Sequence, residues 1–351
     1  MKRLVKIVVA AFLYYTGLEA VLRRVLPRRN AAIIMFHSVQ ENSSLARAAG
    51  FCVDPEMFEK QIRFLKRYRC IGMRVVADAV TGRSTLPPNA VAVTFDDGYA
   101  DNYLVAYPIL RKYGVPATVY LATDYIDSDR WLPLNRLYDA VFRSGRTSFD
   151  LPLGLRTNIL TLDITTEADK HAAIKFLRAR LKKLSAEDLE RYVDEMSAQL
   201  QQETVRPRGK EFSMLGWEQV RAMADIIEFG SHTATHCILS RVDDQRLFSE
   251  LDRSKKEIEQ KTGSSVQHFA YPNGHREDYT DAAVVQLHRC GYVTAVTTVE
   301  GISHAPDEAL ELKRFSMGEP HCVIALELLG IITAIRSWFA SRDPSRVGGY
   351  P

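Results

Sequence analysis

Residues 91–98, with the sequence VAVTFDDG, form an apolar, β-branched run that ends in two adjacent aspartates and a glycine. A short apolar run of this composition predicts a buried strand. Two like charges at the end of a buried strand are costly unless hydrogen-bond donors or a metal ion offset them. Asp96 and Asp97 are therefore candidates for metal coordination and acid–base chemistry at the edge of a sheet.

Strand-like apolar runs alternate with helical segments along most of the chain. This alternation is typical of βαβ units in a parallel sheet or barrel, and it predicts an α/β fold with its main domain at about residues 31–318. The strands are expected at residues 31–36, 91–95, 117–121, 226–229, 266–270, 292–299 and 312–317.

Residues at about 125–213 interrupt this alternation. Apolar side chains recur at roughly helical spacing through the charged segment 167–202, which predicts helix. We interpret the interruption as a helical insertion. It could form a lid-like subdomain or an antiparallel helix pair on the rim of the main domain, and the sequence leaves both forms open.

Two flanking segments complete the predicted organisation: an N-terminal basic and apolar helix at 1–30, and a C-terminal apolar helix with a tail at 319–351. The uncharged stretch Ile7–Leu18 is shorter than the roughly 20 residues that a spanning helix needs. Basic residues lie on both sides of it, and no small-residue cleavage site follows. We expect a helix that lies on an anionic membrane surface or packs on the domain, with an uncleaved anchor as a third alternative.

Composition narrows the partners and the compartment. The formal net charge is +3, and the excess base is concentrated in the first 29 residues, so nucleic acid is not an expected partner. Five scattered cysteines without CxxC spacing argue against a disulfide framework and favour a reducing compartment. We therefore expect a cytoplasmic protein, with residues 1–30 as a point of peripheral contact with the inner face of a membrane.

Two histidines follow another predicted strand, in the sequence SHTATH at 231–236. If this segment forms a helical turn, the four-residue spacing places His232 and His236 on one face. Neutral imidazole binds zinc and similar metals well. A carboxylate beside the histidines could complete a metal site while its neighbour accepts a proton from water.

Three segments together carry a family resemblance: TFDDG at 94–98, SHTATH at 231–236 and YPNG at 271–274. They resemble the first three motifs of the polysaccharide deacetylase family, also called the NodB homology domain. The resemblance implies a distorted (β/α) barrel of about seven strands. It also implies a hydrolase that removes N-acetyl groups from the amino sugars of a polysaccharide or glycan precursor.

The same resemblance implies roles for individual residues. Asp96 would be the catalytic base, and Asp97, His232 and His236 would bind one divalent metal ion, with Zn²⁺ as the first candidate and other divalent ions open. The implied partner is an N-acetylated saccharide. The loop formed by Tyr271, Pro272, Asn273 and Gly274 is expected to approach the acyl group and to supply an oxyanion donor.

Two departures from the family pattern stand out. Many members carry an arginine in the third motif that orients the base, and the corresponding position here is Ala270, so this support is absent or comes from elsewhere. Many also have a C-terminal histidine as general acid, and none lies in the last predicted strand. His37 follows the first predicted strand, as in exopolysaccharide deacetylases with an N-terminal histidine, and it is the expected general acid.

Two other functions remain in view. The missing arginine is compatible with a catalytically weak saccharide-binding or scaffold protein of a membrane-associated glycan pathway. A two-histidine, one-carboxylate iron oxygenase is the other, although the βαβ alternation disfavours it. The sequence does not identify the glycan, the metal or the oligomeric state.

Overall fold

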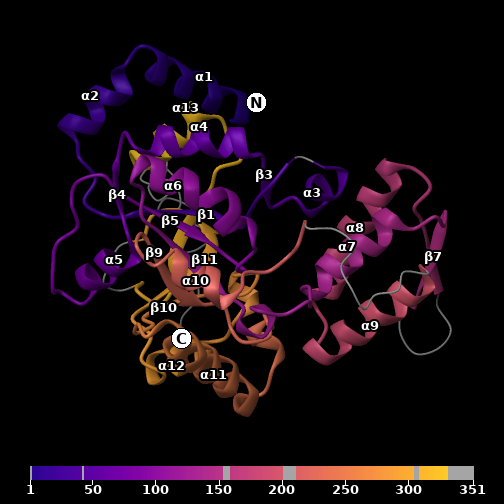
Figure 1. The fold of residues 1–351 in the computed structure, drawn as a ribbon. Coiled ribbons are helices and arrows are strands. Elements are labelled where there is room, and N and C mark those ends of the chain that lie inside the picture. The colour runs from indigo at the N-terminus through magenta and orange to yellow at the C-terminus, as the bar shows by residue number, and fades with distance from the viewer. Residues whose placement is uncertain (1, 42, 153–158, 201–210, 304–307, 331–351) are drawn as a thin grey trace, which may run out of the picture.

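Seven parallel strands form a closed barrel at the centre of the molecule (Figure 1). The computed structural model describes residues 2–41, 43–152, 159–200, 211–303 and 308–330. The barrel strands are β1 Ala32–Phe36, β5 Ala90–Phe95, β6 Ala117–Leu121, β9 Ile227–Ser231, β10 His268–Ala270, β11 Thr294–Glu300 and β12 Leu312–Ser316. Each overlaps one of the seven predicted runs.

The strand order around the barrel is β1-β12-β11-β10-β9-β6-β5, and pairing of β1 with β5 closes the ring. A further strand, β4 (Arg69–Ile71), pairs with the first residues of β5 outside this ring. The predicted distorted (β/α) barrel of about seven strands is confirmed.

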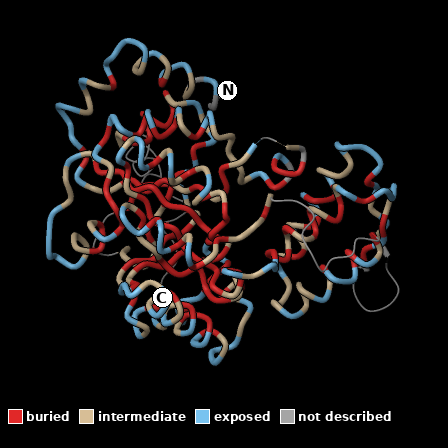
Figure 2. Tube along the Cα trace, viewed as in Figure 1, coloured by how far each residue is buried: buried red, intermediate tan, exposed pale blue. Residues whose placement is uncertain are grey.

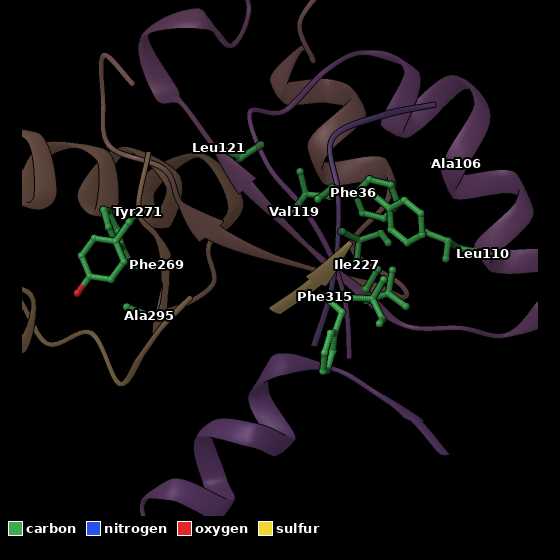
Figure 3. Close-up of a cluster of buried hydrophobic side chains, with 14 of the residues drawn as sticks. Phe36, Ala106, Leu110, Val119, Leu121, Ile227, Phe269, Tyr271, Ala295 and Phe315 are labelled. Carbon is green, nitrogen blue, oxygen red and sulfur yellow. The ribbon is translucent and has the colours of Figure 1, made fainter. Parts of the chain in front are cut away.

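Strand side chains alternate between the inside and the outside of the barrel. In β5, Ala90 and Ala92 belong to a cluster made mainly of strand residues, which fills the interior. Val91, Val93 and Phe95 belong to a larger cluster that also contains residues of the surrounding helices. Figure 3 shows part of this outer layer, where side chains of the strands lie beside those of a covering helix. Both faces of β5 are therefore apolar, as in other parallel sheets.

Helices cover the outside of the barrel. They are α4 Pro55–Leu65, α5 Met73–Val80, α6 Tyr107–Tyr113, α10 Trp217–Ala222, α11 Asp244–Thr262 and α12 Asp281–Arg289. A π-helical turn, Asn102–Ala106, leads into α6. The caps follow the sequence: Asp54, Asp243 and Thr280 each accept a backbone N–H of the first turn that follows.

A separate lobe lies beside the barrel (Figure 1) and is formed by residues between β6 and β9. It contains α7 Pro133–Arg143, β7 Ser148–Pro152, β8 Ile159–Asp163, α8 Glu167–Leu181 and α9 Ala186–Gln199. The strands β7 and β8 pair antiparallel, and the helices share their own apolar cluster. The boundaries of the insertion stay predictions, and residues 153–158 and 201–210 lie outside the described residues.

Short elements lie between the longer strands and helices. They are β2 Ser38–Val39, α3 Ser44–Ala49 and β3 Cys52–Val53, with 3₁₀ turns at Thr123–Tyr125, Leu239–Arg241 and Arg276–Asp278. Buried side chains of α3 belong to the same apolar cluster as those of the lobe. The chain that follows β1 is therefore packed against the lobe.

The N-terminal helices and the last described helix lie together on one side of the barrel (Figure 1). Helix α1 (Lys2–Tyr15) packs on α13 (His321–Leu328), and α2 (Leu18–Val25) leads towards β1. The predicted C-terminal helix begins as α13, but its continuation in residues 331–351 lies outside the described residues. Among the helices described, none has the length and apolar character needed to cross a membrane.

Candidate active site

The candidate site lies at the carboxyl ends of the barrel strands, where functional groups of (β/α) barrels gather. Asp96 follows β5 and continues its inward alternation. Asp97 has a φ of 76° and Gly98 a φ of 88°, so the chain turns sharply after the first carboxylate. A Cβ atom at Gly98 would lie 3.0 Å from Leu121 Cδ2, which leaves little room for a side chain. The turn directs the two carboxylates to different partners.

Asp97, His232 and His236 form a group whose potential ligand atoms all lie within 4.8 Å of one another. Asp97 Oδ1 is 3.4 Å from His232 Nε2 and 3.2 Å from His236 Nε2. Zinc bonds of about 2.0–2.1 Å at tetrahedral angles place neighbouring ligand atoms about 3.3–3.4 Å apart. The three side chains therefore fit a small divalent metal ion.

The ring of His232 is held in the orientation that a metal ligand needs. Its Nδ1–H donates to the carbonyl oxygen of Ala270 over 2.7 Å. Because a carbonyl can only accept, Nδ1 carries a proton, and Nε2 is the ring nitrogen that lies next to Asp97 and is available to a metal. Such a second partner behind the ligating nitrogen is usual for histidine ligands. Burial opposes ionisation of Asp97, but its contacts with the two histidines hold its pKa well below the usual value.

The histidine segment is a loop and not the helical turn that the spacing suggested. Thr233 and His236 have φ values of 64° and 58°, a conformation that is uncommon outside glycine. The two histidine rings nevertheless lie with their centroids 4.8 Å apart. Backbone strain at such positions is typical of functional sites held by their surroundings.

A buried carboxylate holds this loop. Glu250 of α11 is 3% exposed and accepts the backbone N–H groups of Ala234 and Thr235 at 3.0 and 2.9 Å. It also accepts the Thr235 hydroxyl at 2.8 Å. The sequence analysis missed Glu250, because nothing in the spacing links it to the histidines. Cys237 beside them is buried, and burial raises the pKa of its thiol to about 12, so it is an inert packing residue.

The predicted base has a partner that the sequence analysis also missed. Arg314 of β12 donates from Nη1 to Asp96 Oδ1 and from Nη2 to Asp96 Oδ2, both at 2.7 Å. Its Nε donates to the Thr297 carbonyl at 2.7 Å. Burial alone would raise the pKa of Asp96, but the charge and hydrogen bonds of Arg314 outweigh it and the pKa is lowered. The support expected at Ala270 thus comes from the last strand of the barrel.

One signal in the sequence could have pointed to Arg314. Leu312 and Phe315 belong to the inner and outer clusters respectively, so the alternation of β12 directs Arg314 inward. A charged side chain on the buried face of a central strand needs a buried partner of opposite charge. Asp96, on the inward alternation of β5, is such a partner.

His37 completes the group from the end of β1. Its Nε2 lies 3.8 Å from Asp96 Oδ2, and its side chain is 23% exposed. Burial lowers its pKa, although Asp96 and Asp97 act in the opposite direction. Asn102 donates to the His37 carbonyl at 2.8 Å, which fixes the end of the strand. The five residues predicted from the sequence as base, acid and metal ligands therefore lie in one site.

The loop of Tyr271, Pro272, Asn273 and Gly274 has contacts of a more structural kind. Tyr271 is buried, stacks on Tyr279 with ring centroids 4.0 Å apart and donates to the Leu310 carbonyl. The Gly274 N–H donates to the Pro272 carbonyl within the loop. For Tyr271 these are the contacts of a core residue, and an oxyanion role for the loop stays a prediction.

The fold and site define a (β/α)-barrel protein with a candidate metal centre at the carboxyl ends of its strands. The chain belongs to the polysaccharide deacetylase family: the family model "Polysaccharide deacetylase" matches residues 83–295, more than half of the chain.

Named relatives match shorter segments. The putative polysaccharide deacetylase YxkH of Bacillus subtilis (strain 168) is 34% identical over 91 residues, which cover 25% of this chain and 30% of YxkH. Poly-beta-1,6-N-acetyl-D-glucosamine N-deacetylase of Escherichia coli (strain K12) is 27% identical over 104 residues, covering 29% of this chain and 15% of that protein. The chain thus matches less than a third of the length of either relative.

Solved structures show a similar fold over most of the chain. The deacetylase PplD of Streptococcus pyogenes, in complex with acetate, is 20% identical with a TM-score of 0.56 and covers 86% of this chain and 99% of its own. IcaB of Ammonifex degensii is 18% identical with a TM-score of 0.54, and the match covers 86% of this chain and 98% of IcaB. At these identities the likeness concerns the fold.

Proposed function

We propose that this protein is a metal-dependent carbohydrate N-deacetylase, which hydrolyses the acetamide of amino sugars in a polysaccharide or glycan precursor. The observation that carries the proposal is the convergence of three groups at one edge of the barrel. These are the Asp97–His232–His236 group, the Asp96–Arg314 pair and His37. Relatives whose names state deacetylation of a poly-N-acetylglucosamine support the substrate class.

The metal would be held by Asp97, His232 and His236. A divalent ion there would lower the pKa of a bound water and polarise the acetamide carbonyl. Zn²⁺ is the first candidate because two imidazoles and one carboxylate are typical of its catalytic sites, although other divalent ions accept the same ligands.

Asp96 would accept a proton from the attacking water as its oxygen bonds to the carbonyl carbon. The pairing with Arg314 keeps Asp96 ionised despite its burial, so that the carboxylate is available as a base. Both Asp96 oxygens accept from Arg314, which leaves their remaining lone pairs for the water.

His37 would donate a proton to the amine nitrogen as the C–N bond breaks. Its position suits this role, because it lies beside Asp96 and is partly exposed, where a saccharide can reach it. The proton that Asp96 takes from the water would pass to His37 and from there to the amine nitrogen, so both groups end as they began. The products are a free amino sugar and acetic acid, which carries the second proton of the water and ionises to acetate.

The reason for considering the saccharide-binding alternative no longer applies. It depended on the missing arginine of the third motif, and Arg314 supplies that interaction from another strand. A cytoplasmic location stays a prediction from the cysteine pattern.

The test is acetate release from N-acetylglucosamine oligomers by purified protein whose metal content is measured. We expect activity in the natural chain, its loss in Asp96→Asn, and loss of both metal and activity in His232→Ala/His236→Ala. A His171→Ala/His288→Ala variant is the matched control, because it removes two histidines outside the site. Full activity in the His232/His236 variant would contradict the metal assignment, and binding of oligomers without turnover under several metals would contradict the deacetylase proposal.

A further inference from the structure

The N-terminal helices expose an unusual amount of apolar surface. Of the fourteen large apolar side chains that are exposed in the described structure, nine lie between residues 4 and 26. They are Leu4, Val8, Val9, Phe12 and Tyr15 on α1, and Leu18, Val21, Val25 and Leu26 on or just after α2. Figure 2 shows exposed segments along this arc at the edge of the molecule. A concentration of this kind marks an interaction surface.

Helix α1 is apolar on two opposite sides. One side packs on the body, where Ala10 is buried against Cys322, Val323 and Leu326 of α13. The other side carries Leu4, Val8 and Phe12, spaced four residues apart on one face. A helix with apolar side chains on two opposite sides requires an apolar environment on both, and the described residues provide only one.

The position of the helices is fixed by polar contacts with the body. Lys6 pairs with the buried Glu327 of α13 at 2.6 Å. Arg28, after α2, donates to the carbonyl of Ala90 at 2.7 Å, and its backbone N–H donates to Asn89. Ala90 begins β5, so α2 is attached at the amino ends of the strands, the edge opposite to the candidate active site.

The charge of the segment identifies the partner chemistry. Residues 1–30 contain seven Lys/Arg residues and one acidic residue, a formal charge of +6 against +3 for the whole chain. The acidic residue, Glu19, is 2% exposed and accepts the Tyr68 hydroxyl. Arg24 and Arg29 are exposed. Apolar side chains flanked by exposed basic residues are typical of helices that lie in the headgroup region of an anionic bilayer.

We infer that α1 and α2 form a membrane-docking surface that lies on an anionic lipid bilayer. Leu4, Val8 and Phe12 enter the boundary between headgroups and acyl chains, and the exposed arginines contact the anionic headgroups. Helix α1 has 14 residues, about 21 Å of helix, which is shorter than the roughly 30 Å hydrocarbon core. It therefore lies on the bilayer. Self-association through the same face would place two strongly basic segments together, which disfavours a second copy as the partner.

The docked orientation has a consequence for the enzyme. Because α2 is attached at the amino ends of the strands, the candidate active site at their carboxyl ends is directed away from the attachment edge. The inference is independent of the proposed deacetylase activity, and its test requires no turnover.

The test is co-sedimentation of the full chain with vesicles of phosphatidylcholine alone or mixed equally with phosphatidylglycerol. We expect binding to the mixed vesicles, weakened by added salt. Val8→Ser/Phe12→Ser should weaken it by about tenfold or more, because large apolar side chains no longer enter the lipid. Arg24→Gln/Arg29→Gln should weaken binding to the mixed vesicles by about fivefold for each arginine, with little effect on phosphatidylcholine vesicles.

Phe248→Ser/Val285→Ser is the matched control, because it removes one phenylalanine and one valine that are 48% and 51% exposed on α11 and α12. This variant should bind vesicles as the natural chain does, and thermal unfolding should show that all variants fold. Equal binding by the Val8/Phe12 variant and the natural chain would overturn the inference. So would a dimer that dissociates in that variant without any vesicle binding, or vesicle binding that appears only when residues 331–351 are removed.

Discussion

The pair formed by Arg314 and Asp96 offers the sharpest test of the site. Arg314 has no exposed side-chain surface, and Asp96 retains 2%. Two charge-assisted hydrogen bonds of 2.7 Å join them. Arg314→Met removes one partner and leaves the carboxylate buried without compensation, which typically costs about 3–5 kcal/mol of folding free energy. Arg314→Lys keeps the charge but cannot form the two parallel bonds, so we expect an intermediate loss.

The same substitution should change the pH dependence of activity. Burial raises the pKa of Asp96, and Arg314 is the principal group that lowers it. Without Arg314, the pKa of Asp96 should rise, so that a larger fraction of the carboxyl is protonated and unable to act as a base. We expect kcat/KM for acetate release to fall by about 100-fold or more at pH 7. The acid limb of its pH profile should move to higher pH, so that part of the activity returns under alkaline conditions.

A double-mutant cycle separates the pair from the rest of the protein. We expect urea unfolding to show that the double variant Asp96→Asn/Arg314→Met loses less unfolding free energy than the two single variants together. The difference should be about 2 kcal/mol. Arg28→Met is the matched control, because Arg28 is also buried but donates to backbone carbonyls far from the site. That variant should lose stability and keep the acid limb in place. An unmoved acid limb in Arg314→Met, with no more loss of activity than in Arg28→Met, would refute the assigned role.

Four further outcomes follow from other contacts. Chelation should abolish acetate release and an added divalent ion should restore it, whereas activity in protein shown by elemental analysis to be ion-free would contradict the metal centre. His37→Gln should lower kcat for an acetamide about 100-fold but have little effect on an activated aryl acetate, whose leaving group needs no proton; equal losses on both would argue against a general acid. Glu250→Gln should weaken metal binding by about 10–100-fold in competition with a chelating dye, and unchanged affinity would show that the loop does not depend on it. Burial lowers the pKa of His268 to about 3. The unfolded imidazole therefore binds protons below about pH 6.5 while the folded one does not, and stability should fall by about 2 kcal/mol between pH 7.5 and 5. This loss should be absent in His268→Gln, and an identical loss in that variant would contradict the assignment.

The strands were predictable because their signal is local. Each barrel strand is a short apolar run. A strand that is buried on both faces needs such a run, whichever strands it pairs with in the barrel. The helical lobe was less predictable. The segment 167–202 has continuous helical periodicity, but Ser185 accepts the Asp188 N–H and begins a second helix. This N-cap divides the predicted helical segment into α8 and α9.

The site was predictable only where its residues belong to motifs. Asp96, Asp97 and the two histidines follow strands directly, so the expectation that strand ends meet was sufficient to group them. Arg314 lies 218 positions from Asp96, and only the closure of the barrel brings them together. The conformation of the histidine loop was also unpredictable, because it depends on contacts with Glu250 in a later helix.

The order of strands explains why an arginine from β12 can replace one from the third motif. Because β1 pairs with both β5 and β12, Asp96 and Arg314 lie on either side of the strand that His37 follows. Arg314 pairs with Asp96, and histidines bind a metal in their neutral form, so Asp97 would be the one remaining negative charge of the ligand group. A divalent ion there would give the site a net charge of about +1, which favours the negative charge that develops on the acetamide oxygen. The arginine therefore allows two adjacent buried carboxylates to remain ionised with different partners, Asp96 with Arg314 and Asp97 with the two histidines.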